Sequence, residues 1–346
     1  MRVIHLDTKT GHCDVMIGGC LADVSNWIND CRLAVITDKN VSHFYKDHFP
    51  EGKMIEIEPG EKSKTLETVH SIYGQLLDSE MDRTDYILGI GGGVVCDLAG
   101  FVASTYLRGV RFGFVASTLL AQVDASIGGK NGVNFKKFKN IVGVIKQPEF
   151  VICDLNMLKT LDRKEFIAGI AEVIKYGAIM DKGLFDSCDN HSREILDMDL
   201  SVIDELVFRS ASNKVKLVEV DEFETGERTK LNFGHTFAHA LEKMTSLTHG
   251  EAVAIGMNIA GAISVREGLL AEKEASRLKS VIQCMGLPVS LDIDPVKLFN
   301  AIRKDKKKRG DRIGLVLLEE LGRSVIKYMD LDRLKLILDD LYLYST

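Results

Sequence analysis

Apolar positions in the first half of the chain form short runs that alternate with patterns of helical spacing. Residues 33–37, 86–90 and 112–115 are runs of apolar and small side chains, which favour buried strands. Residues 66–79 instead carry apolar side chains three and four positions apart, as one face of a helix requires. Strands that alternate with helices of this length are typical of a parallel sheet built from βαβ units. The pattern therefore predicts an N-terminal α/β domain.

The second half of the chain has a different periodicity. Helical spacing begins near residue 164 and recurs in 198–220, 232–244, 251–267, 271–285 and 295–304, with a strand-like run at 313–318. The change of pattern falls between Asp154 and Arg163. We therefore predict an α/β domain at 1–158 and a mainly α-helical domain at 159–346.

Composition and charge narrow the class of protein. The 346 residues include 45% hydrophobic and 27% charged side chains, as is usual for soluble globular proteins. The net charge of −6 gives no global positive field for nucleic acid or for an acidic membrane surface. The seven cysteines are scattered without a CxxC pair, and no apolar run approaches the ~18 residues of a membrane span. We expect a cytoplasmic protein that binds neither nucleic acid nor membrane.

A glycine cluster follows the second predicted strand. Gly91, Gly92 and Gly93 stand where a strand gives way to a helical pattern, so the backbone can approach a phosphate at the positive end of a helix. The spacing differs from the common GxGxxG motif, and a tight turn without a ligand is the alternative. Polar residues upstream favour a dinucleotide at the carboxyl edge of a Rossmann-like sheet; they are Asp38, Asn40, Glu61 and Lys64.

Potential metal ligands occupy the predicted helical domain. Glu172 lies in the largely apolar stretch 168–177, where a buried carboxylate requires a cation as its partner. His235 and His239 share a helix face, and His249 begins the next helical pattern. Spacing leaves open whether His235 pairs with His239 or with His249, and histidines satisfied within the core are the alternative. A carboxylate with two imidazoles and an open position is typical of catalytic zinc sites.

Basic and amide side chains also stand within small or apolar segments. Each one alone is most simply a solvated surface group, and the run 303–309 reads mostly as an exposed basic loop. Together they suit an anionic substrate that carries phosphate and carboxylate groups. The set comprises Arg108, Lys130, Lys139, Asn140, Lys175, Lys214, Arg228, Asn232 and Lys306.

Many of these candidate residues lie within longer sequence motifs. The pattern GGGVVxDLAGFVAxTYLRG at 91–109 resembles the signature block of 3-dehydroquinate synthases. Further blocks resemble the same family in register: LLAQVDxSxGGK at 119–130, AEVIKYG at 171–177, DExExGxR at 221–228, NFGHTxxHA at 232–240 and HGE at 249–251. The resemblance covers about residues 30–320. On these motifs the chain is identified as a member of this family, with an NAD-binding α/β domain and a helical metal-binding domain.

The resemblance implies roles for individual positions. Glu172, His235 and His249 would bind one divalent metal, zinc or cobalt. The NAD-binding residues would be Asp38, Asn40, Glu61, Lys64, Gly92, Gly93, Val94, Asp97, Ser117, Thr118, Leu120, Asp124, Lys130, Lys139 and Thr160. The substrate, a phosphorylated sugar acid, would contact Asp124, Lys130, Lys139, Asn140, Lys175, Lys214, Arg228, Asn232, His239 and Lys306. Catalytic roles are implied for Lys130, Lys175, His239, Asn140 and Arg108, with Arg108 acting from the neighbouring subunit of a homodimer.

The resemblance also implies a reaction. 3-Deoxy-D-arabino-heptulosonate 7-phosphate would become 3-dehydroquinate and phosphate, the second step of the shikimate pathway. The steps would be transient oxidation by NAD, β-elimination of phosphate, re-reduction and intramolecular aldol closure, which makes the enzyme a carbon–oxygen lyase.

Some positions depart from the family pattern and leave alternatives. Cys96, Ala116, Ser117, Asn131, Asp162 and the segment 135–138 differ from the residues usual there. The alternatives are another sugar phosphate cyclase of the valiolone, deoxy-inosose or amino-dehydroquinate synthase type, a metal-dependent polyol dehydrogenase on the same fold, and a homologue that binds NAD or metal without turnover.

Overall fold

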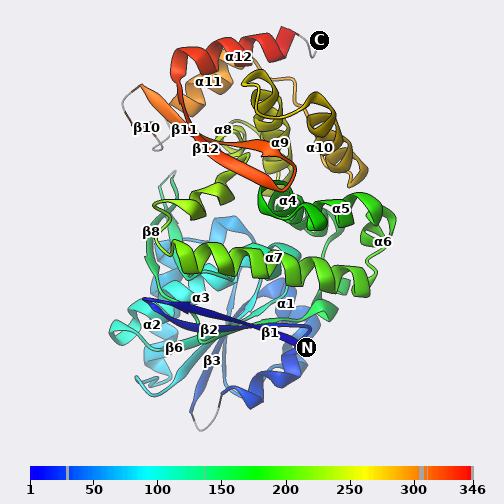
Figure 1. The fold of residues 1–346 in the computed structure, drawn as a ribbon. Helices are drawn as coiled ribbons and strands as arrows, with labels where there is room; N and C mark the ends of the chain where they lie inside the picture. Colours follow the sequence, from blue (N-terminus) through cyan, green and yellow to red (C-terminus); the bar gives the residue numbers. More distant parts are fainter. Residues whose placement is uncertain (29–30, 137, 304–307, 310, 344–346) are drawn as a thin grey trace. The chain divides into compact units, whose positions relative to one another are not determined.

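The structure is a computed structural model that describes residues 1–28, 31–136, 138–303, 308–309 and 311–343. The chain divides into two compact units (Figure 1). The first contains Met1–Phe166 and Ile203–Phe223, and the second contains Ile167–Val202 and the chain from Glu224 onward. The contiguous division at 158/159 expected from the sequence differs from this arrangement, because the chain returns to the first unit after Val202.

A seven-stranded sheet forms the centre of the first unit, in the order β1-β2-β9-β6-β5-β3-β4. Neighbouring strands are parallel except β1 and β2, which form an antiparallel hairpin at one edge. The predicted strands at 33–37, 86–90 and 112–115 are confirmed as β3, β5 and β6. The strands are β1 (Arg2–Thr8), β2 (Gly11–Ile17), β3 (Leu33–Asp38), β4 (Lys53–Ile57), β5 (Tyr86–Gly91), β6 (Arg111–Ala116) and β9 (Phe150–Cys153).

Alternate strand positions supply the core on one side of this sheet. Leu33 and Val35 of β3 belong to the same buried cluster as Leu88 of β5 and Phe150 of β9. Trp27 is the single tryptophan of the chain, and it packs against this cluster with its ring centre 6.1 Å from that of Phe150. Trp27 therefore reports on the packing of the first unit.

The strand order reverses between β3 and β5. From β3 the chain passes through α1 (Lys39–Tyr45) to β4, then through α2 (Leu66–Asp78) to β5 on the opposite side of β3. From β5 it continues through α3 (Gly93–Thr105) to β6. In open parallel sheets, ligands bind beyond the carboxyl ends of the strands at such a reversal. The ends of β3 and β5 are therefore the position expected for a nucleotide.

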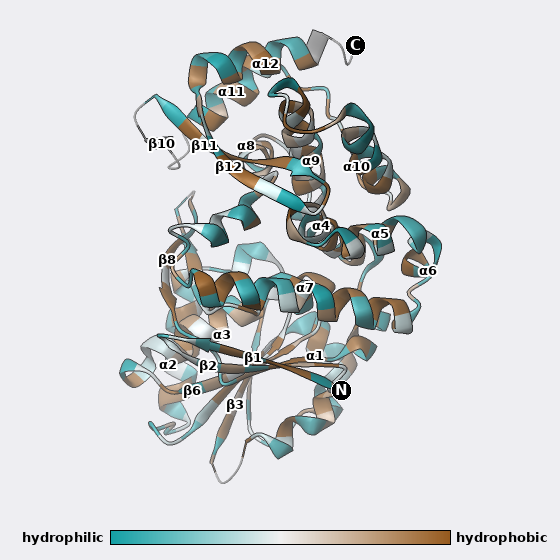
Figure 2. Cartoon of the chain, viewed as in Figure 1, coloured by the Kyte–Doolittle hydropathy of each residue, from teal (hydrophilic) through white to brown (hydrophobic). Residues whose placement is uncertain are grey.

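Two further elements complete the first unit. β7 (Lys130–Phe135) and β8 (Phe138–Ile145) form an antiparallel hairpin apart from the main sheet. α7 (Leu200–Val220) lies mostly in this unit, where Glu205 accepts a hydrogen bond of 2.8 Å from Arg2 of β1. Figure 2 shows hydrophobic and hydrophilic residues alternating along α7, as expected for a helix with one packed face.

Helices dominate the second unit, which confirms the periodicity read from the sequence. The predicted strand-like run 313–318 lies within β11, the central strand of a three-stranded antiparallel sheet. In the described parts of the chain, no helix is long and apolar enough to cross a membrane. The elements are α4 (Arg163–Met180), α5 (Lys182–Asn190), α6 (Ser192–Leu196), α8 (His235–Met244), α9 (His249–Arg266), α10 (Glu272–Cys284), α11 (Pro295–Arg303), β10 (Lys308–Arg309), β11 (Arg312–Glu320), β12 (Arg323–Asp330) and α12 (Leu331–Leu343).

Candidate active site

Three helices of the second unit bring Glu172, His235 and His249 together. Glu172 lies on α4 and is fully buried, while His235 and His249 are the first residues of α8 and α9. The Nε2 atom of His249 is 3.2 Å from Glu172 Oε1, and the Nε2 atom of His235 is 3.5 Å from the same oxygen. One ligand atom from each residue lies within 4.8 Å of the others. His239 is not part of this group, and its ring centre lies 5.7 Å from that of His235.

Hydrogen bonds fix the other nitrogen of each ring. His235 Nδ1 lies 3.1 Å from the carbonyl oxygen of Phe233, and His249 Nδ1 lies 3.1 Å from Glu242 Oε1. A neutral ring that donates its proton through Nδ1 presents the Nε2 lone pair toward Glu172. Two lone pairs and a carboxylate oxygen that face one point require a cation between them. The donor set therefore fits a divalent metal such as zinc, with outer partners that orient both histidines.

Three glycines allow these helices to approach one another closely. A Cβ atom at Gly256 of α9 would lie 2.1 Å from the carbonyl oxygen of Gly234, which precedes α8. A Cβ atom at Gly250 would lie 2.3 Å from the carbonyl oxygen of Ala168 on α4. Gly234 has a φ angle of +77°, in the left-handed region that favours glycine. Backbone contacts through glycine thus set the spacing of the three ligands.

Burial and charge act in opposite directions on the ligands. Burial alone would raise the pKa of Glu172, but Lys175 and the two histidines hold that pKa well below its usual range. Burial lowers the pKa of His235, which favours the neutral ring that a metal needs. Burial would also lower the pKa of His249, but Glu172 and Glu242 raise it to about 9. In the metal-free protein, a proton on His249 therefore supplies part of the positive charge that a metal would bring.

Predicted substrate residues of the second unit lie on α4 and on the turn before α8. Lys175, one turn after Glu172, is buried and forms an ion pair with the Glu172 carboxylate. Arg228 is only 1% exposed and, like Asn232, belongs to the short helix Glu227–Asn232. The Asn232 amide donates to Glu224. Lys175 and Arg228 thus place two buried positive charges in this unit, which would suit an anionic ligand.

At the strand reversal of the first unit, the turns after β5 and β6 pack closely. Gly92 precedes α3, and a Cβ atom there would lie 2.9 Å from the methyl group of Thr118. A Cβ atom at Gly93 would lie 2.9 Å from that of Ala125. Gly92 is the N-cap residue of α3 and has no side chain to cap it, so the first turn of the helix offers its backbone N–H groups to a ligand. This turn fits the phosphates of a dinucleotide.

Asp38 occupies the other side of the same reversal. It ends β3 and caps α1, where its Oδ1 atom accepts hydrogen bonds from the N–H groups of Asn40 and Val41 at 2.9 and 3.0 Å. Burial raises the pKa of Asp38, although these two N–H groups oppose the shift. A carboxylate held at the end of β3 is well placed for the hydroxyl groups of a ribose.

Several of the other predicted cofactor and substrate residues in the first unit form ion pairs between a lysine and a carboxylate. Lys64 is buried, forms an ion pair with Asp97 and donates to Asn140 Oδ1 over 2.6 Å. Burial raises the pKa of Asp97, whereas the charge of Lys64 acts against that change. Lys214 of α7 forms an ion pair with Asp124. Cofactor and substrate residues predicted from different motifs are therefore linked within one unit.

The other predicted residues are spread over several elements, and those that the structure describes lie in the first unit. Arg108 lies on an exposed turn. Glu61 accepts a hydrogen bond of 2.7 Å from Asn134, and the hydroxyl of Thr160 is 2.8 Å from that of Tyr45. Lys306 lies outside the described residues. Val94 is in the first turn of α3, Ser117 and Thr118 follow β6, Leu120 precedes the short helix Ala121–Ala125, Lys130 begins β7 and Lys139 lies on β8.

Glu242 was not among the predicted site residues. It lies seven residues after His235 and three after His239, so the three share one face of α8. That spacing was the available signal, because an acidic residue on a histidine-bearing face is a common outer partner of a metal ligand.

Two family models match adjacent parts of the chain. The model described as 3-dehydroquinate synthase N-terminal matches residues 54–168, and the model described as 3-dehydroquinate synthase C-terminal matches residues 169–308. The chain belongs to the 3-dehydroquinate synthase family. A 3-dehydroquinate synthase from Campylobacter concisus is 44% identical over 306 residues, which cover 86% of this chain and 87% of that relative. One from Pelobacter propionicus is 39% identical over 351 residues, which cover 96% and 98%.

A solved structure of a related enzyme has a similar fold to this chain. The 2-epi-5-epi-valiolone synthase from Streptomyces hygroscopicus, solved with NAD+ and Zn2+ bound, has a TM-score of 0.88 and 26% identity. The alignment covers 99% of this chain and all of that structure. The fold is that of the sugar phosphate cyclases related to dehydroquinate synthase.

One departure from the 3-dehydroquinate synthase pattern has a structural explanation. Asn131 is buried, and its amide donates to the carbonyl oxygens of Gly129 and Lys146 at 2.8 and 2.9 Å. A Cβ atom at Gly100 of α3 would lie 1.9 Å from the Asn131 side-chain oxygen. Asn131 thus joins the base of the β7–β8 hairpin to α3, and its amide is engaged by the protein itself.

Proposed function

We propose that this chain is a 3-dehydroquinate synthase, which converts 3-deoxy-D-arabino-heptulosonate 7-phosphate to 3-dehydroquinate and phosphate. Relatives of that name at 39–44% identity over most of the chain support this activity. The observation that carries the proposal is the convergence of Glu172, His235 and His249 beside the buried Lys175. A polyol dehydrogenase on the same fold would need the metal ligands, but it would have little use for buried basic residues such as Arg228.

The cofactors of this proposal are NAD and one divalent metal. Glu172, His235 and His249 would hold the metal, and the turn at Gly92 and Gly93 would hold the NAD phosphates. When bound, NAD would accept and return a hydride at one substrate carbon while the metal polarises the oxygen on that carbon. The presence of NAD+ and Zn2+ in the valiolone synthase structure supports both assignments. Imidazole and carboxylate donors suit zinc or cobalt.

The residues of the chain would bind and orient an anionic substrate. The substrate contacts would be Lys175, Arg228, Asn232, Asp124, Lys130, Lys139, Asn140 and Lys214. Ion pairs such as Lys214–Asp124 hold these side chains before the substrate arrives, which reduces reorganisation during the reaction. His239 would pass a proton to or from a substrate hydroxyl. The net reaction breaks one C–O bond to phosphate and forms one C–C bond, and NAD ends in its starting oxidation state.

The proposal includes a homodimer in which Arg108 contacts the phosphate of the neighbouring subunit's substrate. The turn that carries Arg108 supports this role. Leu107 and Arg108 have φ angles of +49° and +68°, and both side chains are exposed. A non-glycine residue held in the left-handed region costs about 1–3 kcal/mol and is found preferentially at functional positions.

The experiment that tests the activity is phosphate release from 3-deoxy-D-arabino-heptulosonate 7-phosphate with NAD and zinc, before and after chelation. We expect chelator-sensitive release without accumulation of NADH, since the hydride returns to the substrate in each turnover. Net NADH formation from a polyol would instead indicate a dehydrogenase. A folded, zinc-loaded protein that releases no phosphate from this sugar acid would rule out the proposal, and other heptulose phosphates would then be the substrates to examine.

A further inference from the structure

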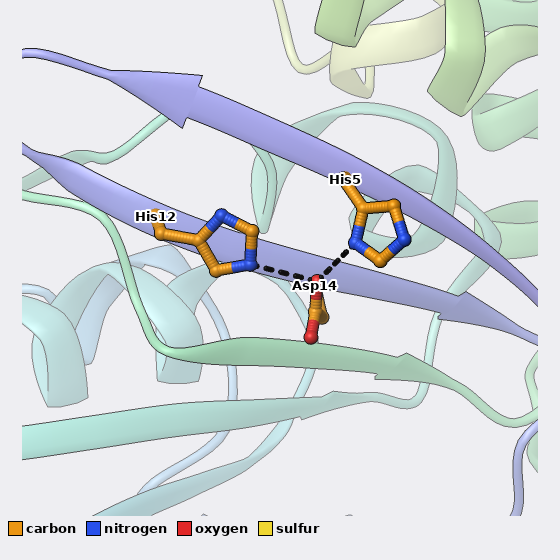
Figure 3. Close-up of side chains that lie close together, drawn as sticks. All are labelled: His5, His12 and Asp14. Carbon is orange, nitrogen blue, oxygen red and sulfur yellow. Dashed lines mark hydrogen bonds and ion pairs between the residues drawn. The ribbon is translucent and has the colours of Figure 1, made fainter.

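The β1–β2 hairpin carries four polar side chains on one of its faces. Cross-strand register pairs His5 with Asp14 and Asp7 with His12, and residues two apart along a strand point to the same side. The His5 side chain is 67% exposed, that of His12 is 50% exposed and that of Asp14 is 20% exposed. Figure 3 shows the two imidazoles on either side of the Asp14 carboxylate. None of these four residues belongs to the candidate active site.

Both histidines of the hairpin contact a single oxygen. His5 Nδ1 lies 2.7 Å from Asp14 Oδ1, and His12 Nε2 lies 2.9 Å from the same atom. The other nitrogen of His12, Nδ1, lies 2.8 Å from Asp7 Oδ1. The two rings are nearly parallel, with their centres 6.0 Å apart and an angle of 24° between them. His12 therefore has a carboxylate oxygen at each of its nitrogens.

The contacts of His12 with Asp7 and Asp14 cannot both be hydrogen bonds donated by a neutral imidazole. A neutral imidazole carries one N–H, so a His12 that donates to Asp7 through Nδ1 presents a lone pair from Nε2 toward Asp14. The Asp14 carboxylate is itself only an acceptor, and the contact then needs an additional proton or a cation. The same arrangement occurs at Glu172, where two imidazoles converge on one carboxylate oxygen and Glu242 holds the far nitrogen of His249.

We propose that His5, His12 and Asp14 bind a second divalent transition-metal ion, with Asp7 as the outer partner that orients His12. Imidazole nitrogens with a carboxylate oxygen suit zinc and its neighbours, whereas magnesium and calcium prefer oxygen ligands. In a tetrahedral zinc site with bonds of about 2.0–2.1 Å, ligand atoms are about 3.3 Å apart. The 2.7 and 2.9 Å contacts to Asp14 need only a few tenths of an ångström of expansion to reach that spacing. Water would complete the coordination on the exposed side.

The test counts zinc ions on the full-length, untagged chain by equilibrium dialysis at about 10 µM free zinc. Asp14→Asn preserves the shape of the shared ligand and removes its charge, and His5→Gln removes one imidazole. His43→Gln is the matched control, because His43 is an exposed histidine on α1 outside the cluster. We expect Asp14→Asn and His5→Gln to bind one zinc fewer than wild type, and His43→Gln to match wild type. Asp7→Asn should bind the hairpin zinc about 10–100-fold more weakly.

The comparison is independent of the proposed activity, since it is a difference between variants at the hairpin. An anomalous difference map at the zinc absorption edge gives a direct second measurement, with a peak expected between His5, His12 and Asp14. Equal zinc content in wild type and Asp14→Asn, or a map without that peak, would show that the cluster is only a set of cross-strand ion pairs. Phosphate release should be unchanged in Asp14→Asn, because the hairpin contributes no residue to the candidate active site.

Discussion

The side chain on which the metal cluster depends most is Glu172, because the Nε2 atoms of both histidines face one of its oxygens. Glu172→Gln keeps the volume of the side chain and removes its charge. We expect loss of the catalytic zinc and a fall in phosphate release of at least about 10²–10³-fold. Zinc is counted in the Asp14→Asn background, so that the hairpin adds nothing to the count. Glu242→Gln is the control, since it removes only an outer partner and should weaken zinc about 10–100-fold.

A Glu172→Gln protein that is folded by circular dichroism and still holds one equivalent of zinc in that background would contradict this role.

The raised pKa of His249 makes metal binding depend on pH. Burial favours the neutral ring, but Glu172 and Glu242 raise the pKa to about 9 in the metal-free protein. A proton must therefore leave when zinc binds, and apparent zinc affinity should rise about tenfold per pH unit between pH 6.5 and 8.5. The metal-free protein should show the opposite trend in stability. A raised pKa stabilises the fold fully below the unfolded value of about 6.5, and this contribution is lost as pH rises through 9.

Competition titrations with a chromophoric chelator give the zinc affinities, and urea unfolding of the metal-free protein gives the stabilities. A zinc affinity that does not change across this pH range would contradict the assignment of the proton to His249.

The metal ligands show how much of the site could be predicted from the sequence. Helical spacing placed His235 and His239 on one face of a helix, but it left the metal ligands undecided between His239 and His249. Spacing says nothing about which end of α9 lies beside α8, and this depends on the contact between Gly256 and Gly234. Only the resemblance favoured His249 over His239, and the structure brings His249 beside His235 and Glu172.

At the scale of elements, the contact between α8 and α9 is the feature most open to a test. Gly256→Ala would place a Cβ atom 2.1 Å from the Gly234 carbonyl oxygen, so the two helices must separate. Overpacking of this kind costs about 1–3 kcal/mol, and the displaced His235 and His249 should bind zinc more weakly. Gly74→Ala on α2 is the matched control, because a Cβ atom there meets open space and should stabilise the protein by about 0.5–1 kcal/mol.

Urea unfolding and zinc titration measure both effects. A Gly256→Ala protein with wild-type stability and wild-type zinc affinity would show that the close approach of α8 and α9 is not needed.

Elements with a strong periodic pattern were predictable, and those defined by pairing were not. The buried strands β3, β5 and β6 and the helix α2 were read from their apolar residues. The β1–β2 hairpin was missed, although His5, Asp7, His12 and Asp14 alternate with apolar positions in the manner of a half-exposed strand. β12 pairs with β11 along almost its full length, but its own sequence, RSVIKYMD, mixes charged and apolar residues. Periodicity records burial within one segment and carries little information about its partners.

At the scale of the whole molecule, the two units should respond differently to their ligands. In the Asp14→Asn background, which removes the hairpin site, the remaining metal ligands Glu172, His235 and His249 lie in the second unit, and Trp27 lies in the first. A metal at 100 times its Kd contributes about 2.7 kcal/mol, so chelation should lower the midpoint of the second unit by roughly 5–10 °C. Helical circular dichroism should register this shift more strongly than Trp27 fluorescence, whereas added NAD should raise the fluorescence midpoint. Identical shifts by both probes would contradict separate responses and indicate a single cooperative transition.

Because the chain returns to the first unit after Val202, this unit cannot finish folding early in translation. Arg2 and Thr10 of the N-terminal hairpin segment bond to Glu205 and Glu222, which are translated long after the last strand of the main sheet. When Phe166 leaves the exit tunnel, the edge of the nascent sheet still lacks these partners. Synthesis of α4, α5 and α6 must come first, so the earlier unit finishes folding while the later one has already begun. Nascent chains stalled between 166 and 203 should therefore depend most on chaperones.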